Sequence, residues 1–279
     1  MTARIDLTQL KQRIARIPAL QTESRAPTAV FSTGLPAVDA YLESAGVPLA
    51  AVHEVAGHAG DEEQGAAGAG FLTLMLKASA TSGWIAWVTQ DADLYAPGLA
   101  AFDLDLRRLI LVSARRDAEV CWALEEALRS RALSAVAGEV GVLTLNATRR
   151  LQLAAEQAGL PCFLLRRWRT KDLAERQRAQ PIAAVTRWRI SPQIETDTGL
   201  TLAPELGRIR RRLDLWRCRN AQAASWIMEF DHADEQRVAA FPVAVPAALA
   251  DRSIPATAKS QSAAESEAER AAATLLSFG

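Results

Sequence analysis

Short apolar runs alternate with helical patterns through the middle of the chain. Helical spacing of apolar residues occurs near 67–80, 117–131 and 146–158, and Asp117 stands at the predicted N-cap of the second segment. Parallel strands need crossover helices between them, and strands buried on both faces are uniformly apolar. The pattern therefore predicts an α/β fold with a mainly parallel sheet. The predicted strands are residues 50–56, 84–89, 108–113, 134–140 and 161–166.

After residue 181 the pattern changes to strand-like runs with little helix between them. The runs are AAVTRWRIS, IRRRLDLWRCRN and ASWIMEFD, and residues 191–208, which include two prolines and two glycines, read as a loop. Two or three antiparallel strands that extend the sheet fit best. In the second run Arg210, Arg212 and Asp214 share a face with Trp216. An edge strand protected by charge explains these arginines at least as well as binding does.

The two ends of the chain differ from the middle. Residues 1–17 predict an amphipathic helix, and 18–30 predict a linker rich in proline, serine and threonine. The folded domain is then 31–241, and 242–279 read as a disordered tail. The helix either folds back on its own domain or binds another protein or a second copy. The apolar residues that form its stripe are Leu7, Leu10, Ile14 and Ile17.

Composition limits the chemistry. Lys plus Arg and Asp plus Glu number 32 each, so no global charge attracts nucleic acid or a membrane surface. The sequence lacks an uninterrupted apolar run of about 18 residues, which predicts a cytoplasmic protein. The three cysteines and three histidines are scattered, so neither disulfides nor a metal site are expected. Of the tryptophans, Trp84, Trp87, Trp188 and Trp226 are core candidates.

A glycine-rich segment follows the first predicted strand. It has the layout that leads into the phosphate-binding loop GxxxxGK[ST] of RecA-like ATPases. However, the chain has no lysine or arginine between Arg25 and Lys77, and residues 61–63 are three acids. At about 4 Å each such charge opposes a phosphate charge by about 4 kcal/mol. We therefore predict a degenerate loop, no ATP hydrolysis and no required cofactor, although weak nucleotide binding by glycine amides stays open. Its glycines are Gly57, Gly60, Gly65, Gly68 and Gly70.

Several phrases of the sequence resemble the ImuA family over roughly residues 30–230. They are STGLPAVDAYL, VHEVAG, DLYAPGLAAFDLD, ARRDAEVCWALEEALR, TRRLQLAAEQAG and VTRWRI. The resemblance implies a three-layer RecA-like core and a role in SOS-type, damage-induced translesion DNA synthesis. The implied partners are RecA, an ImuB-like inactive Y-family polymerase homologue and an error-prone replicative-type polymerase. Glu139 and Asp91 line up with the magnesium-linked and water-activating carboxylates of RecA-like sites, and we interpret them as remnants.

An arginine-rich run at 166–180 follows the last predicted parallel strand. It is either a solvated loop or a patch for nucleic acid or an acidic partner surface. We thus expect a non-catalytic scaffold. The alternatives are a SulA-type cell-division inhibitor, which also resembles RecA without its phosphate loop, and a noncanonical RecA-like ATPase. The candidate patch consists of Arg166, Arg167, Trp168, Arg169, Lys171, Arg176 and Arg178.

Overall fold

The computed structural model describes residues 29–42, 44–58, 61–80, 82–130, 132–192, 209–219, 221–230 and 238–243. For 61–65, 209, 230 and 238–243 only the backbone is described. The predicted N-terminal helix, nearly all of the linker, most of the 191–208 loop and the tail beyond residue 243 lie outside these residues.

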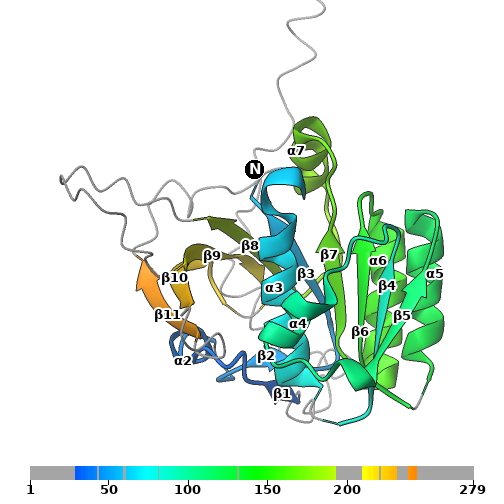
Figure 1. The fold of residues 1–279 in the computed structure, drawn as a ribbon, viewed down its shortest axis with the longest axis horizontal. Coiled ribbons are helices and arrows are strands. Elements are labelled where there is room, and N and C mark those ends of the chain that lie inside the picture. The colour runs from blue at the N-terminus through cyan, green and yellow to red at the C-terminus, as the bar shows by residue number, and fades with distance from the viewer. Residues whose placement is uncertain are drawn as a thin grey trace, which may run out of the picture. The chain divides into compact units, whose positions relative to one another are not determined.

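A sheet that has nine strands among the described residues forms the centre of the fold (Figure 1). Its order is β11-β10-β9-β8-β3-β7-β6-β4-β5. Neighbours from β5 to β8 pair in parallel, and those from β8 to β11 pair antiparallel. The strands are β3 (Val52–Gly57), β4 (Trp84–Thr89), β5 (Leu109–Ser113), β6 (Leu133–Val140), β7 (Cys162–Arg166), β8 (Thr186–Pro192), β9 (Ile209–Cys218), β10 (Ala224–Phe230) and β11 (Val238–Val243).

Helices join the parallel strands, as the sequence pattern predicts. A short antiparallel pair, β1 (Val30–Phe31) with β2 (Val47–Pro48), precedes them. The helices are α2 (Pro36–Asp39), α3 (Asp61–Ser79), α4 (Ala96–Ala101), the 3-10 turn η2 (Leu106–Arg108), α5 (Asp117–Leu128), α6 (Leu145–Ala158) and α7 (Lys171–Ala179). All five predicted parallel strands are confirmed, with ends that differ by at most two residues from those expected.

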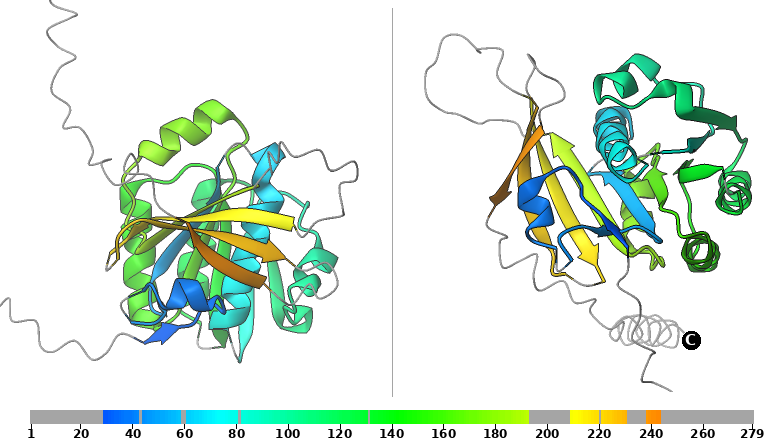
Figure 2. Two further views of the ribbon diagram at one scale, coloured as in Figure 1. Left: turned by 90° about the vertical axis from the view of Figure 1, so that its left-hand side faces the viewer. Right: turned by 90° about the horizontal axis from the view of Figure 1, so that it is seen from below.

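The fold has three layers. Helices α3 and α4 cover one face of the sheet, and α5 and α6 cover the other (Figure 2). Phe71 and Met75 of α3 pack with Trp87, Trp188 and other residues of the first face. Across the sheet, α5 lies close to β6 because position 138 is glycine: a Cβ there would lie 2.6 Å from Cδ1 of Leu124. The predicted three-layer α/β architecture is confirmed. Strand β8, predicted as part of the antiparallel extension, pairs in parallel with β3, and the strands that continue the sheet antiparallel are β9, β10 and β11.

The antiparallel extension corrects two expectations. Strand β9 has neighbours on both sides, β8 and β10, so the interpretation of its arginines as edge protection is wrong. They pair instead within the sheet surface: Arg212 Nε lies 2.8 Å from Asp214 Oδ1. Strand β11 was not predicted, and it runs to Val243, two residues into the expected tail.

Buried aromatic and polar side chains tie β3 to its neighbours. Trp87, Trp188 and Trp226 are buried as predicted, but Trp84 is 47% exposed at the start of β4 and is not a core residue. His53 has both ring nitrogens bonded, Nε2 at 2.9 Å from the carbonyl oxygen of Pro48 and Nδ1 at 2.8 Å from the Thr186 hydroxyl. This agrees with a histidine that satisfies local hydrogen bonds rather than binding a metal.

Candidate functional site

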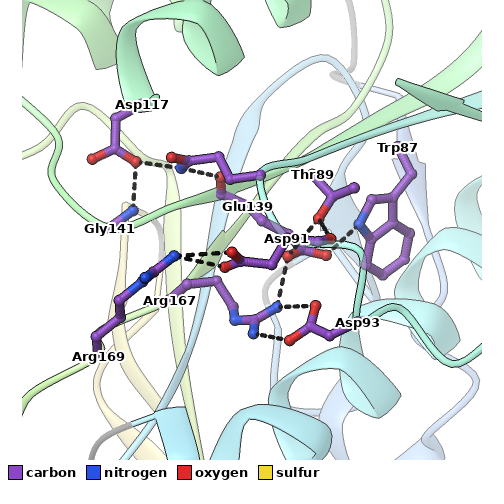
Figure 3. Close-up of polar contacts among 10 residues, drawn as sticks. Trp87, Thr89, Asp91, Asp93, Asp117, Glu139, Gly141, Arg167 and Arg169 are labelled. Carbon is purple, nitrogen blue, oxygen red and sulfur yellow. Dashed lines mark hydrogen bonds and ion pairs between the residues drawn. The ribbon is translucent and has the colours of Figure 1, made fainter. Parts of the chain in front are cut away.

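The candidate site lies where the parallel strands β4, β6 and β7 end. Carboxyl ends of parallel strands meet at one edge of a sheet, which is where ligands bind in open α/β folds. Thr89 ends β4, Glu139 is the penultimate residue of β6, and Arg167 directly follows β7. Figure 3 shows these side chains converging with Asp91 and Asp93, which come from the segment after β4.

Glu139 has both carboxylate oxygens occupied by donors. Trp87 donates its Nε1 proton to Oε1 at 2.7 Å, and Arg167 Nη1 donates to Oε2 at 2.7 Å. The Thr89 hydroxyl also lies 3.0 Å from Oε2. Burial raises the pKa of Glu139, and the Trp87 bond and the Arg167 charge oppose that rise. The carboxylate is thus held in place by protein donors.

Arginines after β7 hold the acids after β4. Arg167 Nη2 lies 2.6 Å from Asp93 Oδ2, so one guanidinium bridges Asp93 and Glu139. The bond from Arg167 lowers the pKa of Asp93. Arg169 Nη2 lies 2.9 Å and 3.0 Å from the two oxygens of Asp91. Both predicted catalytic-type carboxylates, Asp91 and Glu139, are therefore engaged by arginines of the predicted patch (Figure 3).

Asp117 has a different role from the one predicted. Arg116, not Asp117, is the N-cap of α5, and Arg116 makes no side-chain cap bond. The carboxylate of Asp117 instead accepts from the backbone amides of Gly141 and Val142, each at 2.8 Å, and from Gln90 Nε2 at 2.8 Å. Asp117 thereby joins the loops that follow β4 and β6.

The predicted glycine loop is mostly helix. Gly57 ends β3, Gly60 lies outside the described residues, and α3 begins at Asp61, so Gly65 falls within the helix. Gly68 and Gly70 lie further along α3 and permit close packing. A Cβ at Gly68 would lie 3.1 Å from Leu165 Cδ1, and one at Gly70 would lie 3.0 Å from the ring of Phe102. Placing these three glycines in a phosphate-binding loop was therefore wrong.

The predicted arginine patch is also divided by the fold. Arg166 and Trp168 are buried, with 3% and 2% exposure, and cannot belong to an exposed patch. Arg167 and Arg169 are in the ion pairs described above. Arg169, Lys171 and Arg176 stay exposed, and Arg178 is half-buried and donates to the carbonyl oxygen of His58.

A magnesium-nucleotide, which a RecA-like fold implies, does not fit these side chains. Binding would need a solvent-accessible carboxylate for the metal or its water and a cation from the start of α3 for the phosphates. The Glu139 side chain is 2% exposed, and its carboxylate is paired with Arg167 and hydrogen-bonded to Trp87. Lys77, the first cation of α3, is in the last turn and lies 2.8 Å from Asp103. A cavity of about 570 Å³ beside Glu139 is lined mainly by Ala, Gly, Leu and aromatic residues, together with Asp93, Arg167 and Arg211.

The described residues were also considered for a metal site, a reactive cysteine and a membrane-spanning helix. No group of three or more His, Cys, Asp or Glu side chains there is arranged to hold a metal ion. Cys121 and Cys162 are buried, and burial raises the pKa of each thiol, which disfavours the reactive thiolate. Among the described helices, each is too short or too polar to cross a membrane.

Sequence reasoning found the two carboxylates but missed their partners. It placed Arg167 and Arg169 in a solvent-facing patch and did not single out Asp93 or Thr89. The available signal was position, because β7 lies beside β6 and the residues after both strands meet at one edge. The predicted docking residues Leu7, Leu10, Ile14 and Ile17 lie outside the described residues.

Comparison with known proteins gives one consistent result. The chain is 34% identical over 243 residues to a protein named Protein ImuA in two strains of Caulobacter vibrioides, NA1000 / CB15N and ATCC 19089 / CIP 103742 / CB 15. The match covers 85% of this chain and 97% of each relative. No family model matches the chain.

Proposed function

Because the chain belongs to the ImuA family, we propose that it is a non-catalytic, RecA-like accessory protein of damage-induced translesion DNA synthesis. Family membership supports a role in damage-induced mutagenesis. In this proposal the protein is a scaffold that binds RecA, an ImuB-like polymerase homologue, or both, and brings an error-prone polymerase to the same assembly.

The pairing of Glu139 with Arg167 is the observation that carries the non-catalytic part of the proposal. A carboxylate that assists nucleotide hydrolysis must hold a metal-bound or attacking water. The Glu139 carboxylate is buried, paired with Arg167 and hydrogen-bonded to Trp87. Arg169 pairs with Asp91 at the surface, where the two side chains are 72% and 42% exposed. The geometry favours a Glu139 that is held by a buried ion pair.

The exposed edge of the sheet supports the protein-binding part. Strand β5 ends the sheet, and Ile110 and Leu111 are 42% and 56% exposed there. Edge strands of soluble proteins are usually protected by charge, proline or a covering element. β5 contains no charged residue or proline, which is typical of an edge that receives a strand from a partner.

Co-purification from damaged cells tests the scaffold directly. We expect the change of Leu7, Leu10, Ile14 and Ile17 to serine to reduce recovery of RecA or the ImuB-like protein at least about tenfold, because burial of several apolar side chains contributes the binding energy. The matched control changes Gln9, Gln12 and Arg16, on the opposite side of the predicted helix, to serine. Unchanged recovery with the apolar variant would remove the helix from the proposal.

A further inference from the structure

A cluster of arginines lies on the face of the sheet opposite α3, between α7 and strands β8 and β9. Trp188 and Ile190 of β8 pack in the core with α3, so the alternating residues Arg187 and Arg189 point to the other face. Arg212 alternates in the same way with Leu213 on β9. The cluster consists of Arg166, Arg178, Arg187, Arg189 and Arg212, with the carboxylates Glu54 and Asp214.

Both carboxylates of this cluster are already paired. Glu54 accepts from Arg187 Nε, and its other oxygen lies 3.5 Å from Arg166 Nε. Asp214 lies 2.8 Å from Arg212 Nε and also accepts from the Ser225 hydroxyl. Within the described part of the chain, Arg178 and Arg189 make no ion pair at contact distance, and the nearby negative charge that acts on Arg178 is Glu175.

The two arginines also hold donors that none of the described residues accepts. Nη2 of Arg189 and Nε of Arg178 are buried without a hydrogen-bond partner in the described structure. Arg178 is fixed through a bond from Nη2 to the carbonyl oxygen of His58, and its guanidinium lies 5.6 Å from the ring centre of Trp168. Arg189 lies 3.7 Å from the ring centre of Trp216. Both groups are therefore positioned by their surroundings.

The charge of Arg178 acts on Arg189. Burial is the main cause that lowers the pKa of Arg189, to about 10, and the charge of Arg178 is the next. Arg178 and Arg189 also lower the pKa of His58, after burial. Close positive charges with unmet donors are unfavourable, and an anion that accepts those protons would offset both effects.

We propose that Arg178 and Arg189 form a binding site for a phosphate group. Guanidinium groups suit this ligand because their planar N–H pairs match phosphate oxygens. The phosphate belongs either to the backbone of single-stranded DNA or to a free phosphate. Recognition rests on the phosphate alone, because the ring of Trp216 already contacts Arg187 as well as Arg189. The site is independent of the scaffold function proposed above.

Isothermal titration of the full chain with inorganic phosphate, at constant ionic strength set by chloride, tests the site. We expect wild-type protein to bind phosphate, and Arg178→Gln and Arg189→Gln each to weaken binding at least about tenfold, because each removes a charge-assisted donor. Arg107→Gln is the matched control, since it removes the same charge from a 90% exposed side chain outside both the cluster and the predicted patch. A parallel titration uses an unphosphorylated single-stranded oligonucleotide.

The outcomes separate the two sources of phosphate. Loss of oligonucleotide binding with the same two variants assigns the site to the DNA backbone, whereas loss of inorganic phosphate binding alone assigns it to a free phosphate. If Arg189→Gln fails to fold because it loses its contact with Trp216, Arg178→Gln decides, with the melting temperature in phosphate as a second readout. Absence of both kinds of binding to the wild type, or equal binding by all four proteins, overturns the proposal. None of these outcomes bears on the co-purification test of the scaffold, so the two proposals can fail separately.

Discussion

Glu139 and Arg167 form an ion pair whose side chains are only 2% and 18% exposed. Removing one member of such a pair leaves a charge away from water, so Arg167→Met should reduce the free energy of unfolding by about 3 kcal/mol. Chemical denaturation measures this. The double variant Glu139→Gln/Arg167→Met should lose less, because the glutamine is neutral and still accepts from Trp87. Stability of Arg167→Met within about 0.5 kcal/mol of wild type would show that the pair is unimportant.

His53 gives the fold a pH dependence whose sign can be worked out. Burial lowers its pKa from 6.5 to about 4. The unfolded chain therefore binds the proton first, and stability present above pH 6.5 is lost as the pH falls toward 4. We expect a loss of about 3 kcal/mol over this window relative to His53→Asn, measured by denaturation at several pH values. Parallel pH profiles of the two proteins would contradict a buried neutral His53.

The residues of the site were only partly predictable. Glu139 and Asp91 follow apolar strands, and a strand end is visible in the sequence. The pairing of Arg167 with Glu139 depends on β7 lying beside β6, and sheet order is a property of the whole fold. Asp117 was misassigned for a similar reason: a residue at a helix start looks like a cap, but here the amides of the neighbouring loop compete for its carboxylate.

At the scale of elements, α3 shows where local pattern fails. Glycine is a poor helix former, so the glycines from 57 to 65 predict a loop ahead of the helix expected near 67–80. The helix nevertheless begins at Asp61, because small residues let it lie against Leu165 and Phe102, and tertiary packing outweighs propensity. For strand β9 the prediction was wrong for another reason. Its arginines suggest an edge strand, but acids on neighbouring strands of an interior strand can neutralise them. Glu229 of β10, for example, lies 2.6 Å from Arg210 Nε.

A charge on the exposed edge strand β5 should weaken partner binding. Leu111→Lys places a charge on an exposed edge position, which should leave folding stability within about 0.5 kcal/mol of wild type. It should reduce co-purification of RecA or the ImuB-like protein severalfold, because a charged edge disfavours strand addition. Val142→Lys, at a position 46% exposed away from β5, is the control. Equal partner recovery by both variants would exclude β5 from partner binding.

At the scale of the whole molecule, the alternation of apolar runs and helices was sufficient for the fold class. It predicted the five parallel strands β3 to β7 and the strands that extend the sheet, because the hydrophobic period reports burial directly, but not the parallel pairing of β8 with β3. It did not predict β11, of which only Pro242 and Val243 fall in the expected low-complexity tail. The molecule has a RecA-like fold in which Arg167 pairs with Glu139 and Arg169 pairs with Asp91. Its proposed role is therefore to assemble other proteins.

A non-catalytic site should not hydrolyse magnesium-ATP, which is measured as phosphate release by the full chain with and without single-stranded DNA. The double variant Glu139→Gln/Asp91→Asn is the reference, because it removes both carboxylates that a RecA-like reaction would use. We expect the same background rate for wild type and variant under every condition. A wild-type rate at least about tenfold above that of the variant, worth about 1.4 kcal/mol of transition-state stabilisation, would contradict it.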